Sequence, residues 1–149
     1  MKDLFWGIVA VLNSICAKTG LSYAAINILI YTFLFPASWA AIVWFRKKRH
    51  GWMVLAHASL CVAYCANHQN LVGASQYFYD ANIRALEWLG TIFFSIGYIK
   101  ISILIGILLP TFLFTTLCLF PVRHVLSAYV LFLIINLLYY TWVLTLFSR

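Results

Sequence analysis

The stretch LSYAAINILIYTFLFPASWAAIVWF, residues 21–45, decides the fold class. It contains no Asp, Glu, Lys or Arg, and an α-helix needs about 20 apolar residues to cross the hydrocarbon core of a bilayer. The stretch therefore predicts a transmembrane helix. A basic run follows directly, as is typical of the cytoplasmic end of a span. The four residues of this predicted anchor are Arg46, Lys47, Lys48 and Arg49.

The composition of the whole chain agrees with this interpretation. Of its 149 residues, 65% are hydrophobic and 9% are charged, whereas a soluble domain is about one quarter charged. The net charge of +7 would suggest nucleic acid as a partner of a soluble protein, but no basic groove with interleaved aromatic residues accompanies it. We therefore expect an all-α integral membrane protein surrounded by the lipid bilayer, with no nucleic-acid partner.

Two further stretches, residues 101–120 and 126–147, are also long and apolar enough to cross a membrane. Residues 51–67 are at the low limit of length and form either a short span or a re-entrant helix. If they cross, the basic run and Arg123 fall on one side of the membrane and every acid on the other, as the positive-inside rule requires. If they do not cross, Arg123 moves away from the basic run. The three acids are Asp3, Asp80 and Glu87.

We therefore predict four spans in a bacterial inner membrane, with both termini outside the cytoplasm. The chain forms a single membrane domain over residues 1–149. Its predicted parts are an interfacial helix with span 1 in residues 1–50, a short span 2 in 51–70, an interfacial helix in 78–98, span 3 in 99–120 and span 4 in 126–147.

Two amphipathic segments, residues 3–18 and 80–95, are predicted to be helices that lie in the membrane interface. A helical period of 100° per residue places their polar side chains on one stripe and their apolar side chains on the opposite face. The first stripe comprises Asp3, Gly7, Ala10, Ser14 and Lys18, and the second comprises Asp80, Arg84, Glu87, Thr91 and Ser95.

A weak internal repeat relates the two halves of the chain at an offset of 74 residues. In each half an amphipathic segment precedes a span with a central proline, Pro36 or Pro110. Apolar sequences also align by chance, so the alternative to a true duplication stays open. A true duplication gives two units that run in the same direction, an arrangement that occurs in transporters. Further matched pairs are Leu12 and Leu86, Ile15 and Leu89, Ile30 and Leu104, and Leu34 and Leu108.

A stripe of metal-capable side chains, His57, Cys61, Cys65 and His68, is predicted to share one face of a helix. Cys and His are ligands of zinc, copper and haem iron. One helix cannot surround an ion with all four, so a site would need ligands from elsewhere. The simpler interpretation is that the cysteines pack as small apolar residues and the histidines reach water. We expect the stripe to face the protein interior without a metal, because histidine in lipid is costly.

Two amides and two prolines inside the spans have a structural and a functional interpretation. Asn27 and Asn136 form hydrogen bonds between helices or line a pore or a substrate site. Pro36 and Pro110 are static kinks or hinges.

The sequence contains no pair of a nucleophile and a base and no glycine-rich phosphate loop. We therefore expect a non-enzymatic protein without a cofactor. It would act as an oligomeric pore or transporter-like unit, or as an accessory subunit, and assemble with copies of itself or with another membrane protein. The alternative is a metal- or haem-binding membrane protein that uses the His57, Cys61, Cys65 and His68 stripe.

Overall fold

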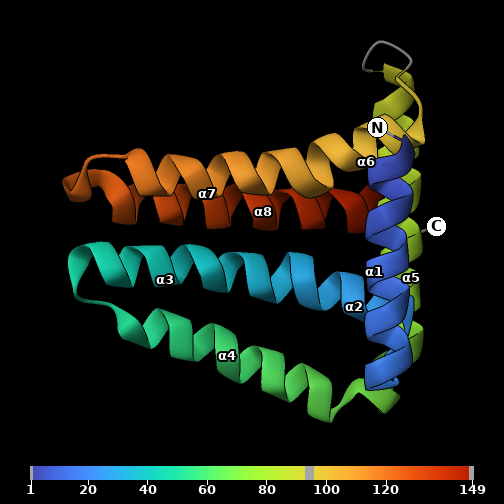
Figure 1. Ribbon diagram of the computed structural model, residues 1–149, viewed down its shortest axis with the longest axis horizontal. Helices are drawn as coiled ribbons and strands as arrows, with labels where there is room; N and C mark the ends of the chain where they lie inside the picture. The colour runs from blue at the N-terminus through green and yellow to red at the C-terminus, as the bar shows by residue number, and fades with distance from the viewer. Residues whose placement is uncertain (1, 93–95, 148–149) are drawn as a thin grey trace.

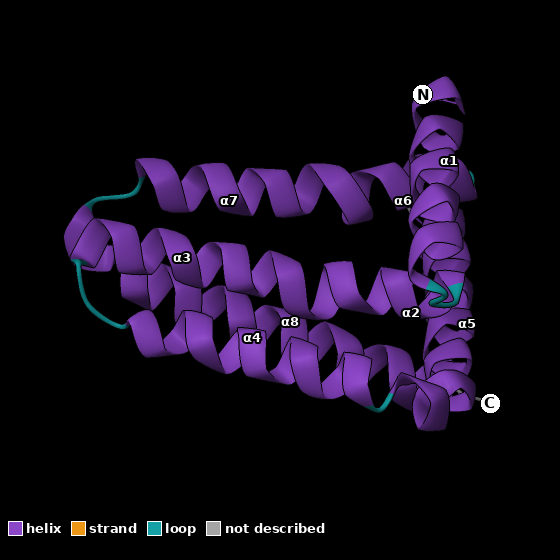
Figure 2. Ribbon diagram, turned by 60° about the horizontal axis from the view of Figure 1, so that its bottom comes forward, coloured by secondary structure: helices purple, strands orange, loops and turns teal. Residues whose placement is uncertain are grey.

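The computed structural model of the chain describes residues 2–92 and 96–147, and these residues form helices joined by short connections, with no strand among them (Figure 2). This confirms the predicted all-α fold.

Three helices are long and apolar enough to cross a membrane. The first runs over Tyr23–Lys47 and consists of α2 (Tyr23–Ile28), the π-helix η1 (Leu29–Leu34) and α3 (Phe35–Lys47). The second runs over Tyr98–Leu119 and consists of α6 (Tyr98–Ile103), the π-helix η2 (Leu104–Leu108) and α7 (Leu109–Leu119). The third joins η3 (Val122–His124) to α8 (Val125–Phe147). The three longest predicted spans are therefore present as helices of sufficient length.

A fourth helix, α4 (Gly51–Ala66), runs alongside the three long ones (Figure 1). It has 16 residues and none of them is buried. The helix predicted over residues 51–67 is present to within one residue, because the chain leaves the helical conformation at Asn67, where φ is −104° and ψ is 11°. Residues 68–70, which the predicted division grouped with it, already belong to the next helix. The Asn67 side chain also donates a hydrogen bond back to the Ala63 carbonyl, which ends α4 locally.

Two helices, α1 (Lys2–Thr19) and α5 (His68–Ile92), lie across one end of the other helices instead of alongside them (Figures 1 and 2). All five residues of the predicted polar stripe of α1 are exposed, whereas Leu12 on the opposite face is buried. In α5 the stripe residues Arg84, Glu87 and Thr91 are exposed as well, whereas Asp80 is half-buried. The amphipathic pattern therefore identified both helices and their faces correctly; Ser95 lies outside the described residues.

The predicted boundaries of the second amphipathic helix are wrong at its N-terminal end. It begins at His68, ten residues before residue 78, because the chain turns directly from α4 into α5 at Asn67. The added turns are held to α4 by a 2.6 Å hydrogen bond between the Tyr64 and Ser75 hydroxyl groups. Ser75 is the buried polar residue at this contact.

The connection from α1 to α2 uses a glycine and a serine. Gly20 adopts φ 72°, a left-handed conformation that ends a helix at little cost for glycine. Ser22 then accepts a hydrogen bond from the Ala25 backbone N–H and caps α2. The chain thus turns from the direction of α1 into the bundle within a few residues.

Two of the three prolines, Pro36 and Pro110, follow a π-helix. Proline has no N–H, and its ring clashes with the carbonyl four residues earlier. The chain widens one turn before each proline: Phe35 N–H bonds to the Ile30 carbonyl, and Leu109 N–H bonds to the Leu104 carbonyl. Each of these bonds spans five residues instead of four. The two widened turns are offset by 74 residues, like the prolines themselves.

The basic run lies at the end of the bundle opposite α1 and α5, together with the turn that carries Arg123 (Figure 1). Arg46 has a specific role there, because its Nη1 donates to the carbonyls of Leu117 and Phe120 at 2.7 and 2.6 Å. These are carbonyls at the C-terminal end of α7, which have no partner within the helix. Arg46 therefore joins α3 to α7, in addition to its predicted place in the anchor.

Candidate functional site

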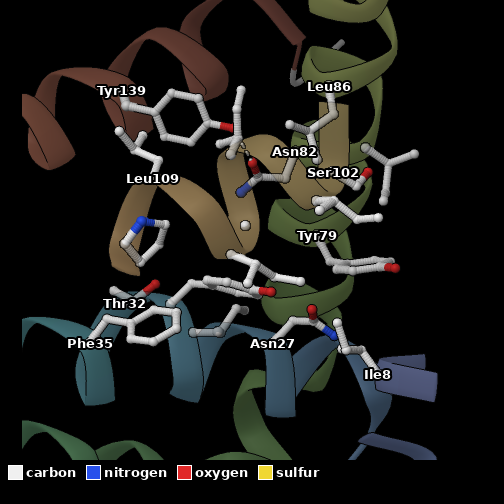
Figure 3. Close-up of a pocket in the computed structure, with 18 of the residues that line it drawn as sticks. Ile8, Asn27, Thr32, Phe35, Tyr79, Asn82, Leu86, Ser102, Leu109 and Tyr139 are labelled. Atoms are coloured by element: carbon white, nitrogen blue, oxygen red, sulfur yellow. Dashed lines mark hydrogen bonds between the residues drawn. The ribbon is translucent and has the colours of Figure 1, made fainter. Parts of the chain in front are cut away.

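A cavity of about 710 Å³ lies where α1 and α5 meet the long helices (Figure 3). Helices α1, α2 and η1 line it from one half of the chain, and α5, α6 and η2 line it from the other. Residues of α3, α7 and α8 complete the wall, whereas α4 contributes none of the described lining residues. Its volume falls in the range of about 300–1,000 Å³ that is typical of small-molecule sites.

The wall is mainly aromatic and aliphatic, and none of the described lining residues carries a charge at neutral pH. Uncharged polar side chains are distributed over it. They are Tyr23, Asn27, Tyr31, Thr32, Tyr79, Asn82, Tyr98, Ser102, Asn136, Tyr139 and Tyr140.

Three of the four residues predicted as hinge or lining candidates reach this cavity. Asn27, Asn136 and Pro110 are among its lining residues. Pro36 is buried but is not one of them. The structure thus brings together residues that the sequence placed in three different helices.

Three amides line the cavity, and two of them, Asn27 and Asn82, come from opposite halves of the chain (Figure 3). Asn27, on α2, donates from its side-chain nitrogen to the Tyr23 carbonyl at 2.8 Å. Asn82, on α5, accepts a 2.6 Å hydrogen bond from the Tyr139 hydroxyl of α8. A further hydrogen bond of 3.3 Å joins the Thr32 hydroxyl to the Tyr140 hydroxyl. Hydrogen bonds therefore join α8 to both halves at the cavity wall.

The two π-helices also meet at the cavity. A Cβ atom on Gly106 of η2 would lie 3.1 Å from the Tyr31 hydroxyl oxygen of η1. That distance is shorter than an ordinary van der Waals contact. Because glycine has no Cβ atom, the Tyr31 side chain can lie directly against η2 at this position.

Reciprocal aromatic contacts cross between the two halves. Phe5 of α1 contacts Tyr98 of α6 with ring centroids 6.1 Å apart and planes at 80°. Tyr79 of α5 contacts Tyr23 of α2 at 5.8 Å and 83°. Both α1 and α5 thus pack an aromatic ring against the first aromatic residue of the long helix in the other half of the chain. Burial raises the pKa of the Tyr79 phenol above its ordinary value, so its hydroxyl stays protonated at neutral pH.

The predicted metal stripe is not one continuous helical face. His68 belongs to α5, beyond the break at Asn67, whereas the other three residues are on α4. His57 and Cys61 are half-buried, and His57 Nδ1 lies 2.8 Å from the Met53 carbonyl, but Cys65 is exposed. His68 is half-buried as well, and the inward orientation of the whole stripe stays a prediction. Across residues 2–92 and 96–147, no three His, Cys, Asp or Glu side chains are grouped to hold a metal ion.

Sequence reasoning missed Asn82 as a site residue. The signal was present, because Asn82 follows Phe78 and precedes Leu86 by four residues and so lies on the apolar face of α5. An amide on the apolar face of an amphipathic helix needs a polar partner. The identity of that partner, Tyr139, has no signal in the sequence.

Comparisons of the chain with protein-family models, with curated proteins and with solved structures find no match.

Proposed function

We propose that the protein is a non-enzymatic, transporter-like membrane unit that takes up an uncharged amphiphilic molecule between two repeated halves. The observation that carries this proposal is the cavity of about 710 Å³ with no charged side chain among its described lining residues. An apolar cavity with a few convergent polar groups is the usual form of a small-molecule site.

A duplicated architecture supports the proposal. Each half has an interfacial helix, a long helix with a π-turn before a proline, and a return helix. The return helices α4 and α8 begin at Gly51 and Val125, again 74 residues apart, and each follows an Arg-His pair. The long helices of both halves run in the same direction away from α1 and α5 (Figure 1). Transporters built from parallel repeats bind their substrates at the interface between the repeats.

The proposed topology has four crossings, with α4 as the short one, in a bacterial inner membrane. Charge supports this orientation. The end with Arg46, Lys47, Lys48, Arg49 and Arg123 carries five basic residues and no acid, whereas the end with α1, α5 and the start of α6 carries four basic residues, Lys2, Lys18, Arg84 and Lys100, beside the acids Asp3, Asp80 and Glu87. By the positive-inside rule, α1, α5 and both termini lie outside the cytoplasm.

Filling the cavity should strongly weaken the binding of an uncharged apolar dye. Leu86 lines the cavity and is half-buried, so Leu86→Trp places a large ring in the binding space. We expect nanodisc-embedded protein to bind Nile red saturably, above the partitioning into empty nanodiscs, and Leu86→Trp to weaken this binding by more than about tenfold. Fluorescence titration measures the binding.

Leu137→Trp is the matched control, because Leu137 is 66% exposed on α8 and does not line the cavity. It should bind the dye like the unmodified chain. Equal dye uptake by both variants and by empty nanodiscs would contradict the proposed function. Assembly into an oligomer or with another membrane protein stays a prediction, and the metal- or haem-binding alternative has no grouped ligands among the described residues to support it.

A further inference from the structure

The side of the cavity between α7 and α8 is open. Leu109 of α7 and Ile135 of α8 both line the cavity, yet they are 45% and 49% exposed. Every other described lining residue of the long helices is buried or half-buried. A residue that lines a cavity and is also exposed lies at the edge of an opening, so these two side chains mark where the wall is interrupted.

Helices α7 and α8 diverge from the turn that joins them. On α7, one face runs from the fully buried Leu117 through the half-buried Leu113 to the exposed Leu109. On α8, exposure rises in the same way from the buried Val125 to Ile135. The two helices overlap in Figure 1 but are separated in Figure 2, with α3 between them in that view. Among the described residues, α4 packs against the π-helix η1 of its own half, whereas α8 makes no comparable contact with η2.

The opening lies near the middle of both helices. Ile135 is eight residues from Val143, which is buried against α5, and Leu109 is eight residues from Ile101, which lies next to Gly90 of α5. At a rise of about 1.5 Å per residue, both positions are about 12 Å from α5. In the proposed topology this depth falls within the hydrocarbon core of the bilayer. The opening therefore faces lipid chains.

The polar side chains of the wall lie at the end of the cavity that α5 covers. In the first long helix the polar lining residues end at Thr32, and in the second they end at Ser102. In α8, Asn136 is the polar lining residue farthest from α5. Every described lining residue of the long helices farther from α5 is apolar, such as Phe35 and Phe132. The cavity thus has a polar, uncharged end beside α5 and an apolar end at the opening.

We propose that the cavity takes up an uncharged lipid with a hydroxyl- and ester-bearing head, such as a monoacylglycerol, sideways from the hydrocarbon core. The head lies among the uncharged polar side chains beside α5, and the hydrocarbon chain leaves through the opening between α7 and α8. No described residue of the wall can neutralise a charged head, and an unpaired charge out of water is strongly unfavourable. This inference rests on the proposed function and specifies its ligand and the route of entry.

Three lipids with the same chain test the head group: 1-oleoylglycerol, oleate at pH 9 and oleyltrimethylammonium. Displacement of Nile red from the full chain in nanodiscs gives the mole fraction of each lipid at half-displacement. We expect the two charged lipids to need a mole fraction about tenfold higher than 1-oleoylglycerol.

A bulky side chain in the opening should select against long chains. Ile135→Trp fills the space that a long chain crosses, whereas a short chain ends inside the cavity. We expect this variant to weaken the binding of 1-oleoylglycerol by about tenfold and that of 1-octanoylglycerol by less than about twofold. In the unmodified chain the two should bind within about twofold of each other, because the rest of the longer chain stays in lipid.

Ile134→Trp is the matched control, because Ile134 is 48% exposed on the same helix and does not line the cavity. It should bind both glycerides like the unmodified chain. Leu109→Trp fills the opening from α7 and should give the same preference for the short chain as Ile135→Trp. Its own control is Leu108→Trp, since Leu108 is 49% exposed and does not line the cavity.

The possible failures separate the ligand and its route from the proposed function. If Nile red binding is saturable and sensitive to Leu86→Trp, but Ile135→Trp and Leu109→Trp affect the short and the long glyceride equally, the lateral route is wrong and the proposed function stands. Binding of either charged lipid as tightly as 1-oleoylglycerol would overturn the assigned ligand class. If Nile red shows no saturable binding, the inference and the proposed function both fail.

Discussion

Replacement of Trp39 by alanine should lower the free energy of unfolding by about 3–5 kcal/mol. Trp39 is 2% exposed and lies in the largest buried cluster, where α3, α7 and α8 meet. Its ring contacts Phe132 in an edge-to-face arrangement with centroids 6.2 Å apart. Inside a membrane, helices associate mainly through close packing. The packing contacts that are lost with the Trp39 ring are therefore not replaced by a hydrophobic gain elsewhere. Unfolding by denaturing detergent in mixed micelles measures the change.

Trp44→Ala is the control for this prediction. Trp44 lies on the same helix but is 43% exposed, and it stacks on the neighbouring Phe45 with centroids 5.3 Å apart. We expect a loss of less than about 1 kcal/mol, in line with surface substitutions. Equal losses in the two variants would show that α3, α7 and α8 do not pack around Trp39.

Replacement of Arg46 by methionine should cost about 2–3 kcal/mol. Methionine keeps most of the apolar stem but removes both hydrogen bonds to the Leu117 and Phe120 carbonyls. The C-terminal carbonyls of α7 then lose a charged donor, and the positive charge that complements the helix dipole is lost as well. The same detergent unfolding experiment measures the effect.

Arg49→Met is the matched control, because it removes one charge of the same basic run from an exposed position. It should change stability by less than about 0.5 kcal/mol. If Arg49→Met is as destabilising as Arg46→Met, the basic run acts through its total charge and the specific bond to α7 is unimportant.

Local sequence patterns were sufficient to predict much of this fold. The length of the apolar stretches identified three of the helices, and the 100° period identified the exposed and buried faces of α1 and α5. The offset of Pro36 and Pro110 indicated a repeat, and the structure has a π-turn before each of them. These features depend on residues within one or two turns of each other.

Features that depend on distant contacts were not predictable. The early start of α5 depends on the turn at Asn67 and on the contact of Tyr64 with Ser75. The cavity depends on pairs such as Asn82 and Tyr139, which are far apart in the sequence and on different helices. Asn27 and Asn136 were identified as unusual amides inside spans, but no local pattern indicates that they line the same cavity.

The most direct test of the account is the side of the membrane on which α1, α5 and the turn between α7 and α8 lie. Single cysteines replace Ser14, Thr91 or His124, which are exposed, in a chain whose four native cysteines are changed to alanine. None of these three substitutions changes the formal charge. A membrane-impermeant maleimide is applied to intact and to permeabilised spheroplasts.

If α4 crosses the membrane and the two halves run in parallel, the cysteines at positions 14 and 91 react in intact spheroplasts. The cysteine at position 124 then reacts only after permeabilisation. Labelling of positions 14 and 124 in intact spheroplasts together with protection of position 91 would place α1 and α5 on opposite sides of the membrane. That result would contradict the four-span arrangement and the cavity between two parallel halves.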